Sequence, residues 1–283
     1  MKDVKYFAAS NLEEAKTLLS EYGCSAAVLA GGTDLVPKIN YYKSIPDVFV
    51  YIGGLPLDYV KEEGGKILIG ACTPTVKLLA SKLLAEKTPA LLEAARSIGS
   101  DAIRTKATIG GNLVNASPAA DFATPLLAMD AEVTLESAGQ IRTMPLKDFF
   151  QGPGQTAMKA EELLTEIAIP VPLGKTSFLK LGRRKALTLS IMNVAVRVVQ
   201  NGDMVETARI AVGAMAPIPM RCTIAESMLA GKKLEQKLID ECAERAISET
   251  SPIDDQRASA WYRRRAGKAM VARALGLAAG LSS

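Results

Sequence analysis

The sequence predicts an α+β fold with mixed sheets, built in two parts. In the first part, short apolar segments typical of strands alternate with amphipathic segments typical of helices. The last third, over residues 222–277, is mostly helical and follows a strand pair. With 283 residues, 48% hydrophobic and 23% charged, the chain is long enough for two domains with a core each.

The elements of the N-terminal half follow from apolar spacing. Residues 10–22 predict a helix that Ser10 or Asn11 can cap and that carries acidic residues in its first turn. The other segments are expected as strands at 26–30, 49–52 and 66–71, and as helices at 75–85 and 90–98.

The elements after residue 120 are expected in the same way. Residues 121–129 predict a helix, 131–136 a half-exposed strand, 149–154 a loop, and 166–170 a strand that a proline ends. Residues 170–174 are the best domain boundary, which gives domains at 1–174 and 175–283, the first with parts at about 1–56 and 57–174. Strands at 191–199 and 208–212 flank a turn at Asn201-Gly202-Asp203, which is a hairpin pattern.

Two glycine pairs follow apolar segments and precede small polar residues. The runs are Ala30-Gly31-Gly32-Thr33-Asp34-Leu35 and Thr108-Ile109-Gly110-Gly111-Asn112. Paired glycines permit positive φ and let a ligand approach without meeting a Cβ atom, and N–H groups of such turns can converge on phosphate oxygens. Each run alone is more often a plain turn. Two runs far apart in the chain suggest one ligand with two phosphates, which is a dinucleotide.

Several function classes are excluded by what the sequence lacks. It contains neither the P-loop pattern nor G-x-G-x-x-G, and it has no histidine for Ser-His-Asp or Cys-His catalysis or for ordinary metal sites. The four cysteines form no C-x-x-C pair and are expected to be small buried hydrophobes rather than metal ligands. We therefore expect no catalytic side chain and no metal site, and an enzyme of this kind needs a cofactor.

Charge and hydropathy limit which partners and which cellular location are expected for the chain. The net charge of +4 is mild and its basic residues are scattered, which does not favour nucleic acid. The aromatic and basic run at 261–265 is expected to be a solvated helix surface or a contact with a partner subunit. There is no signal peptide pattern and no apolar run long enough to span a membrane, so the expected location is cytoplasmic.

Three stretches give the chain a specific resemblance. AGGTDLVP at 30–37, TIGGNLVNASPAADFATPLLAMDA at 108–131 and FLKLGRR at 178–184 resemble the FAD-binding subunit of the molybdenum hydroxylases, the family of xanthine dehydrogenase and aerobic carbon monoxide dehydrogenase. The resemblance covers nearly the whole chain. It implies a two-part FAD-binding domain of the vanillyl-alcohol-oxidase (PCMH) type, followed by a C-terminal α/β domain with a small antiparallel sheet and helices.

The resemblance also implies which residues bind FAD. They are Ala27, Val28, Leu29, Ala30, Gly31, Gly32, Thr33, Asp34, Leu35, Ile98, Thr108, Ile109, Gly110, Gly111, Asn112, Asp121, Leu164 and Lys180. Within this set Asp34 is expected to accept backbone N–H groups and fix its turn, and Ile109 to pack.

Four members of this set also have an ordinary structural interpretation. Asp121 is a helix cap on the sequence alone and a ligand of the adenosine side by resemblance. Lys180 is a surface lysine on the sequence alone, and by resemblance a cation near the isoalloxazine ring. Leu164 and Ile98 are ordinary core residues on the sequence alone. By resemblance Leu164 is a backbone contact to that ring, and Ile98 matches a position that is aromatic in some relatives.

The implied function is electron transfer within a heteromeric enzyme. The molybdenum cofactor and the [2Fe–2S] clusters are expected on two partner subunits, in a complex that is a dimer of heterotrimers, and the final acceptor is NAD+, a quinone or oxygen. No cysteine lies between Cys72 and Cys222, which disfavours relatives with an extra [4Fe–4S] cluster, and no aromatic residue lies in the loop 152–156, which leaves NAD+ open. Two alternatives are a self-sufficient FAD-dependent oxidase or reductase, and a non-enzymatic nucleotide-binding scaffold.

Overall fold

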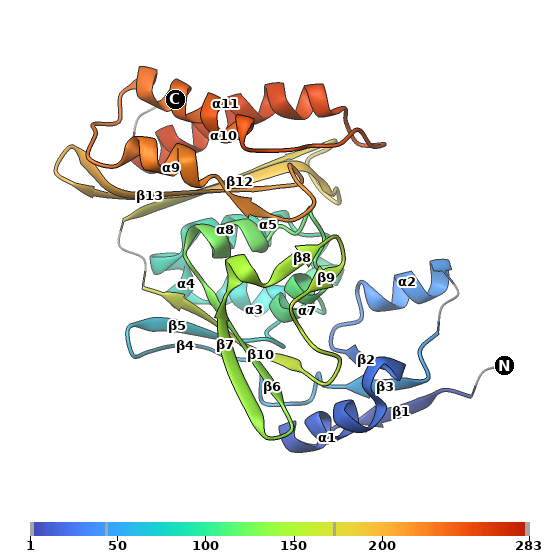
Figure 1. The fold of residues 1–283 in the computed structure, drawn as a ribbon. Coiled ribbons are helices and arrows are strands. Elements are labelled where there is room, and N and C mark those ends of the chain that lie inside the picture. Colours follow the sequence, from blue (N-terminus) through green and yellow to red (C-terminus); the bar gives the residue numbers. More distant parts are fainter. Residues whose placement is uncertain (1–2, 43–44, 172–173, 281–283) are drawn as a thin grey trace.

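Three layered units follow one another along the chain. A computed structural model describes residues 3–42, 45–171 and 174–280. In Figure 1 the N-terminal unit lies at the lower right, a five-stranded sheet with its helices lies in the middle, and a four-stranded sheet with three helices lies at the top. The α+β fold predicted from the sequence is confirmed.

The N-terminal unit is a small parallel sheet with strand order β1-β3-β2. Its elements are β1 (Lys5–Ala8), α1 (Leu12–Tyr22), β2 (Ala26–Leu29), α2 (Leu35–Tyr42) and β3 (Val48–Tyr51), with a 3-10 turn at Gly23–Ser25. Asn11 caps α1, because its side chain accepts a hydrogen bond from the Glu14 N–H at 2.9 Å. The predicted helix and two strands are confirmed, whereas β1 and α2 were not predicted.

The middle unit is an antiparallel sheet with strand order β4-β5-β10-β6-β7. The strands are β4 (Val60–Glu63), β5 (Lys66–Gly70), β6 (Glu132–Ser137), β7 (Gln140–Pro145) and β10 (Leu163–Pro170). The helices are α3 (Thr75–Ala80), α4 (Lys82–Lys87), α5 (Pro89–Ser97), α6 (Asp101–Arg104), α7 (Ile109–Val114) and α8 (Ala123–Ala128). Strands β5, β6 and β10 confirm three predictions, whereas β4 and β7 are exposed edge strands that the apolar pattern missed.

Two predictions for the middle unit were wrong in detail. The helix expected at 75–85 is divided into α3 and α4 at Ser81. The Ser81 side chain caps α4 by accepting a hydrogen bond from the Leu84 N–H at 3.3 Å. The segment expected as a loop at 149–154 contains a short hairpin, β8 (Phe150–Gly152) with β9 (Gln155–Thr156), after a 3-10 turn at Leu146–Asp148. The loop signal marked its turn, where Gly154 has a φ of 71°.

The C-terminal unit is an antiparallel sheet with strand order β11-β12-β13-β14. Its elements are β11 (Lys175–Gly182), β12 (Ser190–Asn201), β13 (Met204–Gly213), β14 (Met220–Arg221), α9 (Thr223–Leu229), α10 (Gln236–Ser248) and α11 (Ala260–Ala279). The predicted hairpin is confirmed as β12 and β13, and so are the helices of the last third. Of the predicted boundary at 170–174, residues 172–173 lie outside the described residues.

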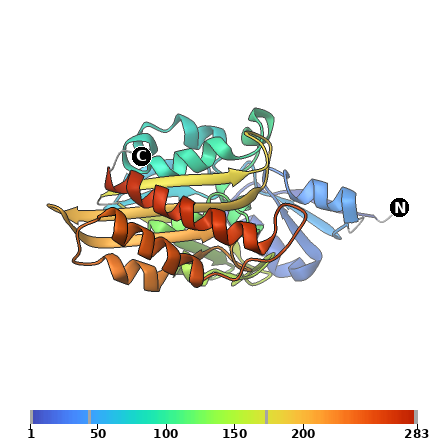
Figure 2. The ribbon, with the colours of Figure 1, turned by 90° about the horizontal axis from the view of Figure 1, so that it is seen from above.

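Both faces of the C-terminal sheet are covered. Figure 2 shows α11 crossing its outer face, and α9 and α10 complete that layer. On the inner face lie α5 and α8 of the middle unit (Figure 1), and Phe178, Ala195 and Ala211 of the sheet share one buried cluster with these helices. The middle unit and the C-terminal sheet are therefore joined by a continuous core.

Two surface expectations need correction. Cys24 is exposed, although Cys72, Cys222 and Cys242 are buried as predicted. In the run expected on a helix surface, Trp261 is exposed but Arg263 is only 1% exposed, donating to Asp255 and to the Ala214 carbonyl. The helical spacing of this run turns Arg263 inward.

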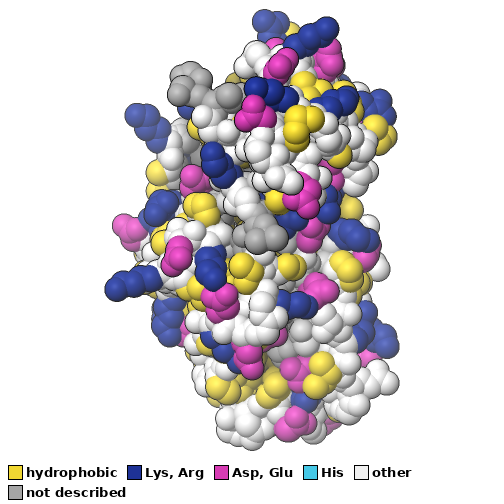
Figure 3. Space-filling model, turned by 90° about the vertical axis from the view of Figure 1, so that its left-hand side faces the viewer, with side chains coloured by type: hydrophobic (Ala, Val, Ile, Leu, Met, Phe, Trp, Pro, Cys, Tyr) yellow, Lys and Arg dark blue, Asp and Glu magenta, His cyan; other side chains and the backbone are white. Residues whose placement is uncertain are grey.

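The described surface carries charges of both signs. On the face shown in Figure 3, basic and acidic side chains are interspersed. Within the described residues, no helix has the length and apolarity needed to cross a membrane. No group of acidic residues and cysteines in that part of the chain is placed to hold a metal ion.

Candidate cofactor site

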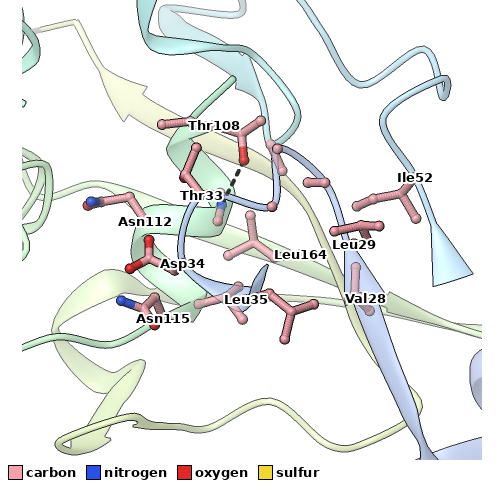
Figure 4. A pocket seen from close by; sticks show the side chains of 18 of the residues that line it. Val28, Leu29, Thr33, Asp34, Leu35, Ile52, Thr108, Asn112, Asn115 and Leu164 are labelled. Carbon is pink, nitrogen blue, oxygen red and sulfur yellow. Dashed lines mark hydrogen bonds between the residues drawn. The ribbon is translucent and has the colours of Figure 1, made fainter. Parts of the chain in front are cut away.

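A cavity of about 500 Å³ lies between the N-terminal and middle units. Its walls come from β2 and the turn after it, from α7, and from the segment that leads into β10 (Figure 4). Most residues predicted to bind the cofactor line it: Ala27, Val28, Leu29, Ala30, Gly31, Gly32, Thr33, Asp34, Leu35, Ile98, Thr108, Gly110, Gly111, Asn112 and Leu164. Two segments far apart in the sequence therefore meet at one pocket, as their glycine pairs suggested.

The first glycine run is an open turn between β2 and α2. Gly32 has a φ of 71°, and a Cβ atom on Gly31 would lie 1.8 Å from the Lys106 carbonyl oxygen, so neither position accepts a side chain. The backbone N–H groups over 31–34 donate no hydrogen bond to any described residue. The turn thus presents consecutive unpaired donors at the pocket, the arrangement that binds phosphate oxygens.

Asp34 does not act as expected within this turn. Its carboxylate accepts no hydrogen bond from the described part of the chain, so it does not fix the turn through backbone N–H groups. Instead the Asp34 carbonyl accepts the Lys38 N–H at 3.1 Å at the start of α2. Figure 4 shows the Asp34 side chain beside the pocket, between Asn112 and Asn115.

The second glycine run is a helix start rather than a loop, which corrects the prediction of a second N–H cradle. Thr108 caps α7 and accepts the Gly111 N–H at 3.1 Å, the bond drawn in Figure 4. The N–H groups of Ile109, Gly110 and Asn112 donate to the carbonyls of Thr73, Ala71 and Thr108 at 3.1, 2.9 and 3.1 Å. Among the backbone N–H groups of this run, only that of Thr108 donates to no described residue, so the run presents no row of donors to phosphate.

Close packing explains the glycines of the second run. A Cβ atom on Gly110 would lie 2.6 Å from the Ala71 Cβ, so glycine lets α7 approach the end of β5. Ile109 is fully buried beneath this contact, as predicted, and does not line the pocket. What the run offers a ligand is Asn112, whose Oδ1 is buried without a partner among the described residues.

The remaining walls are mainly apolar. Leu164, with 2% exposure, and Ile98 both line the pocket, joined by Ile103, Phe122 and Met158. Apolar walls with a few polar groups are typical of sites that bind a small molecule or a cofactor.

Two predicted residues lie behind the pocket rather than in it. Lys180 Nζ is 2.6 Å from Asp121 Oδ2 and 3.0 Å from the Ser97 carbonyl oxygen. Neither Lys180 nor Asp121 lines the pocket, although Ser97 directly precedes Ile98, which does. The helix-cap interpretation of Asp121 is wrong, because Phe122 occupies the N-cap of α8, and the buried Lys180 is not a surface lysine.

Several lining residues were missed by sequence reasoning. Lys38 of α2 donates to Asn115 at the end of α7 and so joins the two walls; Lys159 and Glu162 lie on the third wall. A cation four residues after Asp34 was a usable signal for Lys38. Nothing in the sequence marks Lys159 or Glu162, because their place depends on how the segment before β10 folds.

Known proteins match the chain over nearly its full length. The model for the FAD binding domain in molybdopterin dehydrogenase matches residues 2–172, and that for the CO dehydrogenase flavoprotein C-terminal domain matches residues 177–278. The chain is 33% identical over 273 residues to the glyceraldehyde dehydrogenase medium chain of Sulfolobus acidocaldarius, covering 96% of this chain and 97% of the relative. It is 37% identical over 248 residues to the nicotinate dehydrogenase FAD-subunit of Eubacterium barkeri, covering 85% and 84%.

Solved structures agree with the sequence relatives. A chain of the carbon monoxide dehydrogenase from Hydrogenophaga pseudoflava superimposes with a TM-score of 0.95 at 31% identity, covering 99% of this chain and 98% of that chain. Sequence, fold and the two matched domains therefore agree. The chain belongs to the family of FAD-binding medium subunits of molybdenum hydroxylases, which are components of oxidoreductases.

Proposed function

We propose that this chain is the electron-transfer subunit of a molybdenum hydroxylase and holds FAD in the pocket between β2, α7 and the start of β10. The observation that supports the proposal most is the set of unpaired N–H groups over residues 31–34, in a turn that lines this pocket. Backbone donors of this kind bind a pyrophosphate without adding a side chain to the site.

The other features of the pocket fit the same cofactor. The cavity volume of about 500 Å³ lies within the range of cofactor sites. The unpaired Oδ1 of Asn112 needs a hydroxyl or amino donor, and FAD carries several. Lys38 and Lys159 place positive charge on two walls, opposite which only the Asp34 carboxylate is unpaired, because Arg142 neutralises that of Glu162.

Each group of residues has a distinct task toward the cofactor. Residues 31–34 hold the pyrophosphate, Asn112 orients a hydroxyl-bearing part, and Leu164 with Ile98 keeps water from the ring. The Lys180–Asp121 pair supports the wall at Ile98 through the Ser97 carbonyl. When bound, FAD supplies the redox chemistry that links one-electron donors to one- or two-electron acceptors. No side chain of this chain has to act as nucleophile or base.

The names of the relatives support an assembly of several different chains. They are medium chains or subunits of dehydrogenases, so we infer partners that carry the molybdenum cofactor and the [2Fe–2S] clusters, arranged as a dimer of heterotrimers. The final acceptor is NAD+, a quinone or oxygen. The two alternative functions have less support. A self-sufficient FAD-dependent oxidase or reductase needs a substrate site of its own, and a non-enzymatic nucleotide-binding scaffold has no need of apolar walls around a flavin ring.

A spectrum of the purified chain tests the proposal. We expect flavin bands near about 370 and 450 nm, release of FAD on denaturation, and uptake of added FAD by the apoprotein. We also expect at most diaphorase activity from the isolated chain and co-purification with two further chains. Substrate turnover by the chain alone would favour the self-sufficient oxidase or reductase. Failure to take up FAD would contradict both flavoprotein functions and leave only the nucleotide-binding scaffold.

A further inference from the structure

A buried carboxylate outside the glycine runs organises one wall of the pocket. Glu162 lies between β9 and β10, and its side chain is 5% exposed. Arg142 of β7 meets it with two parallel contacts, Nε to Oε1 at 2.6 Å and Nη2 to Oε2 at 2.8 Å. This two-pronged geometry is the strongest form of arginine–carboxylate pairing. Glu162 lines the pocket, whereas Arg142 does not.

The same two side chains hold the backbone between them. Nη2 of Arg142 also donates to the Ala157 carbonyl at 2.7 Å, and the Glu162 carboxylate accepts the Lys159 N–H at 2.8 Å. The Glu162 N–H donates back to the Lys159 carbonyl at 3.1 Å. Residues 157–162 therefore wrap around one guanidinium group. We call Arg142, Glu162, Ala157 and Lys159 the Arg142 clamp.

The clamped turn presents its other side chains to the cavity. Met158, Lys159 and Ala160 line the pocket, and Leu163 and Leu164 continue the same wall into β10. In the sheet, Arg142 pairs with Leu135, and Leu135 pairs with Leu164. The edge strand β7 thus fixes a wall that lies two strands away.

We propose that Arg142 is a positioning residue for cofactor binding: through Glu162 and the Ala157 carbonyl it fixes the wall at 157–164 against which the cofactor packs. This inference rests on the proposed function that the pocket holds FAD. Without the guanidinium, the buried Glu162 carboxylate loses its charge partner and the turn has to rearrange. The cofactor then has to order the wall as it binds, and this entropy cost weakens cofactor binding.

Three variants of the full chain test the clamp. Arg142→Ala removes it, Arg142→Lys keeps the charge without the two-pronged contact, and Lys66→Ala is the control. Lys66 is a matched control because it lies on the same sheet and its side chain is 44% exposed, against 39% for Arg142. Its Nζ lies 2.6 Å from Glu132 Oε2, and neither Lys66 nor Glu132 lines the pocket. The readouts are the FAD dissociation constant, from quenching of flavin fluorescence, and the melting temperature of each apoprotein.

We expect Arg142→Ala to weaken FAD binding by about tenfold or more, since it removes charge-assisted hydrogen bonds from the wall. Arg142→Lys should recover part of this loss, and added guanidinium ion should partly rescue Arg142→Ala. Lys66→Ala should bind FAD within about twofold of the unchanged chain. The inference is overturned if Arg142→Ala binds FAD as tightly as the unchanged chain. It is also overturned if Lys66→Ala loses as much FAD affinity as Arg142→Ala.

A second readout separates this inference from the proposed function. If the unchanged chain takes up no FAD, the proposed function fails, and amide hydrogen exchange of the apoprotein still tests the clamp. The Lys159 N–H should exchange at least about tenfold faster in Arg142→Ala than in the unchanged chain. An unchanged rate overturns the clamp. Should Arg142→Ala not fold, Glu162→Gln keeps the shape and removes the charge, and tight FAD binding by it would also overturn the inference.

Discussion

Lys180 Nζ lies 2.6 Å from Asp121 Oδ2, and each of the two side chains is only 9% exposed. The other carboxylate oxygen of Asp121 accepts from Ser190 Oγ at 2.6 Å and from Asn193 Nδ2 at 2.9 Å. These contacts join the segment before α8 to β11 and β12. Asp121 is thus one polar joint between the middle unit and the C-terminal sheet; Asp130, which pairs with Arg197, Arg209 and Arg221, is another.

Removing one member of this pair should be costly. Asp121→Ala leaves a buried ammonium and two buried donors without their acceptor, so we expect the free energy of unfolding to fall by about 3–5 kcal/mol. Lys180→Ala should destabilise for the same reason. Because the two losses share one interaction, the double variant should lose less than the sum of the single variants. Urea unfolding of all four proteins measures this, and strictly additive losses would contradict a coupled pair.

The close approach at Gly31 predicts a steric effect on cofactor binding. In Gly31→Ala the new methyl group would lie 1.8 Å from the Lys106 carbonyl oxygen, so the turn with its free N–H groups has to shift. We expect FAD uptake by the purified chain to be lost or reduced by at least about tenfold. Gly54→Ala is the control, since its methyl group meets nothing within 4 Å and Gly54 does not line the pocket. Equal uptake by both variants would contradict the assignment of the pyrophosphate to this turn.

Local patterns predicted the elements that bury an apolar face. The α1 helix, strands β2, β5 and β10, and the β12–β13 hairpin follow from apolar spacing and turn residues that the surrounding fold reinforces. Strand β4, of sequence Val-Lys-Glu-Glu, has no apolar alternation because it is an exposed edge. The sequence could not indicate that it pairs with β5.

The site was predictable where it depends on glycine and less so elsewhere. The pairs at 31–32 and 110–111 identified the two segments that meet at the pocket. Their different roles depend on neighbours: Gly110 packs against Ala71, which is 39 residues earlier in the chain, so its N–H is already used. Likewise, the interpretation of Asp121 as a cap failed because Lys180, Ser190 and Asn193 arrive from distant strands.

Thiol reactivity should distinguish one cysteine from three. Cys24 is exposed, whereas burial raises the pKa of Cys72 and that of Cys242 to about 12 and shields both, and burial also raises the pKa of Cys222. A thiolate is the reactive form, so Ellman's reagent at pH 8 should titrate one thiol in the native chain and four after denaturation. Cys24→Ser should then show none in the native state. Rapid reaction of a second thiol would mean that a buried segment opens.

The Arg142–Glu162 pair should make stability depend on pH in a defined direction. The hydrogen bonds from the Arg142 guanidinium lower the pKa of Glu162 below its ordinary value of 4.5, and the Lys159 N–H adds to this. A depressed folded-state pKa contributes stability above the unfolded pKa, and this stability is lost as the pH falls through the folded pKa. The unchanged chain should therefore exceed Arg142→Ala in free energy of unfolding at about pH 6 to 7, and the gap should narrow toward about pH 3. Other carboxylates titrate over the same range. The quantity to compare is therefore the difference in free energy of unfolding between the two proteins at each pH. Urea unfolding at each pH supplies it, and a gap that stays constant would show that the carboxylate of Glu162 is not what Arg142 stabilises.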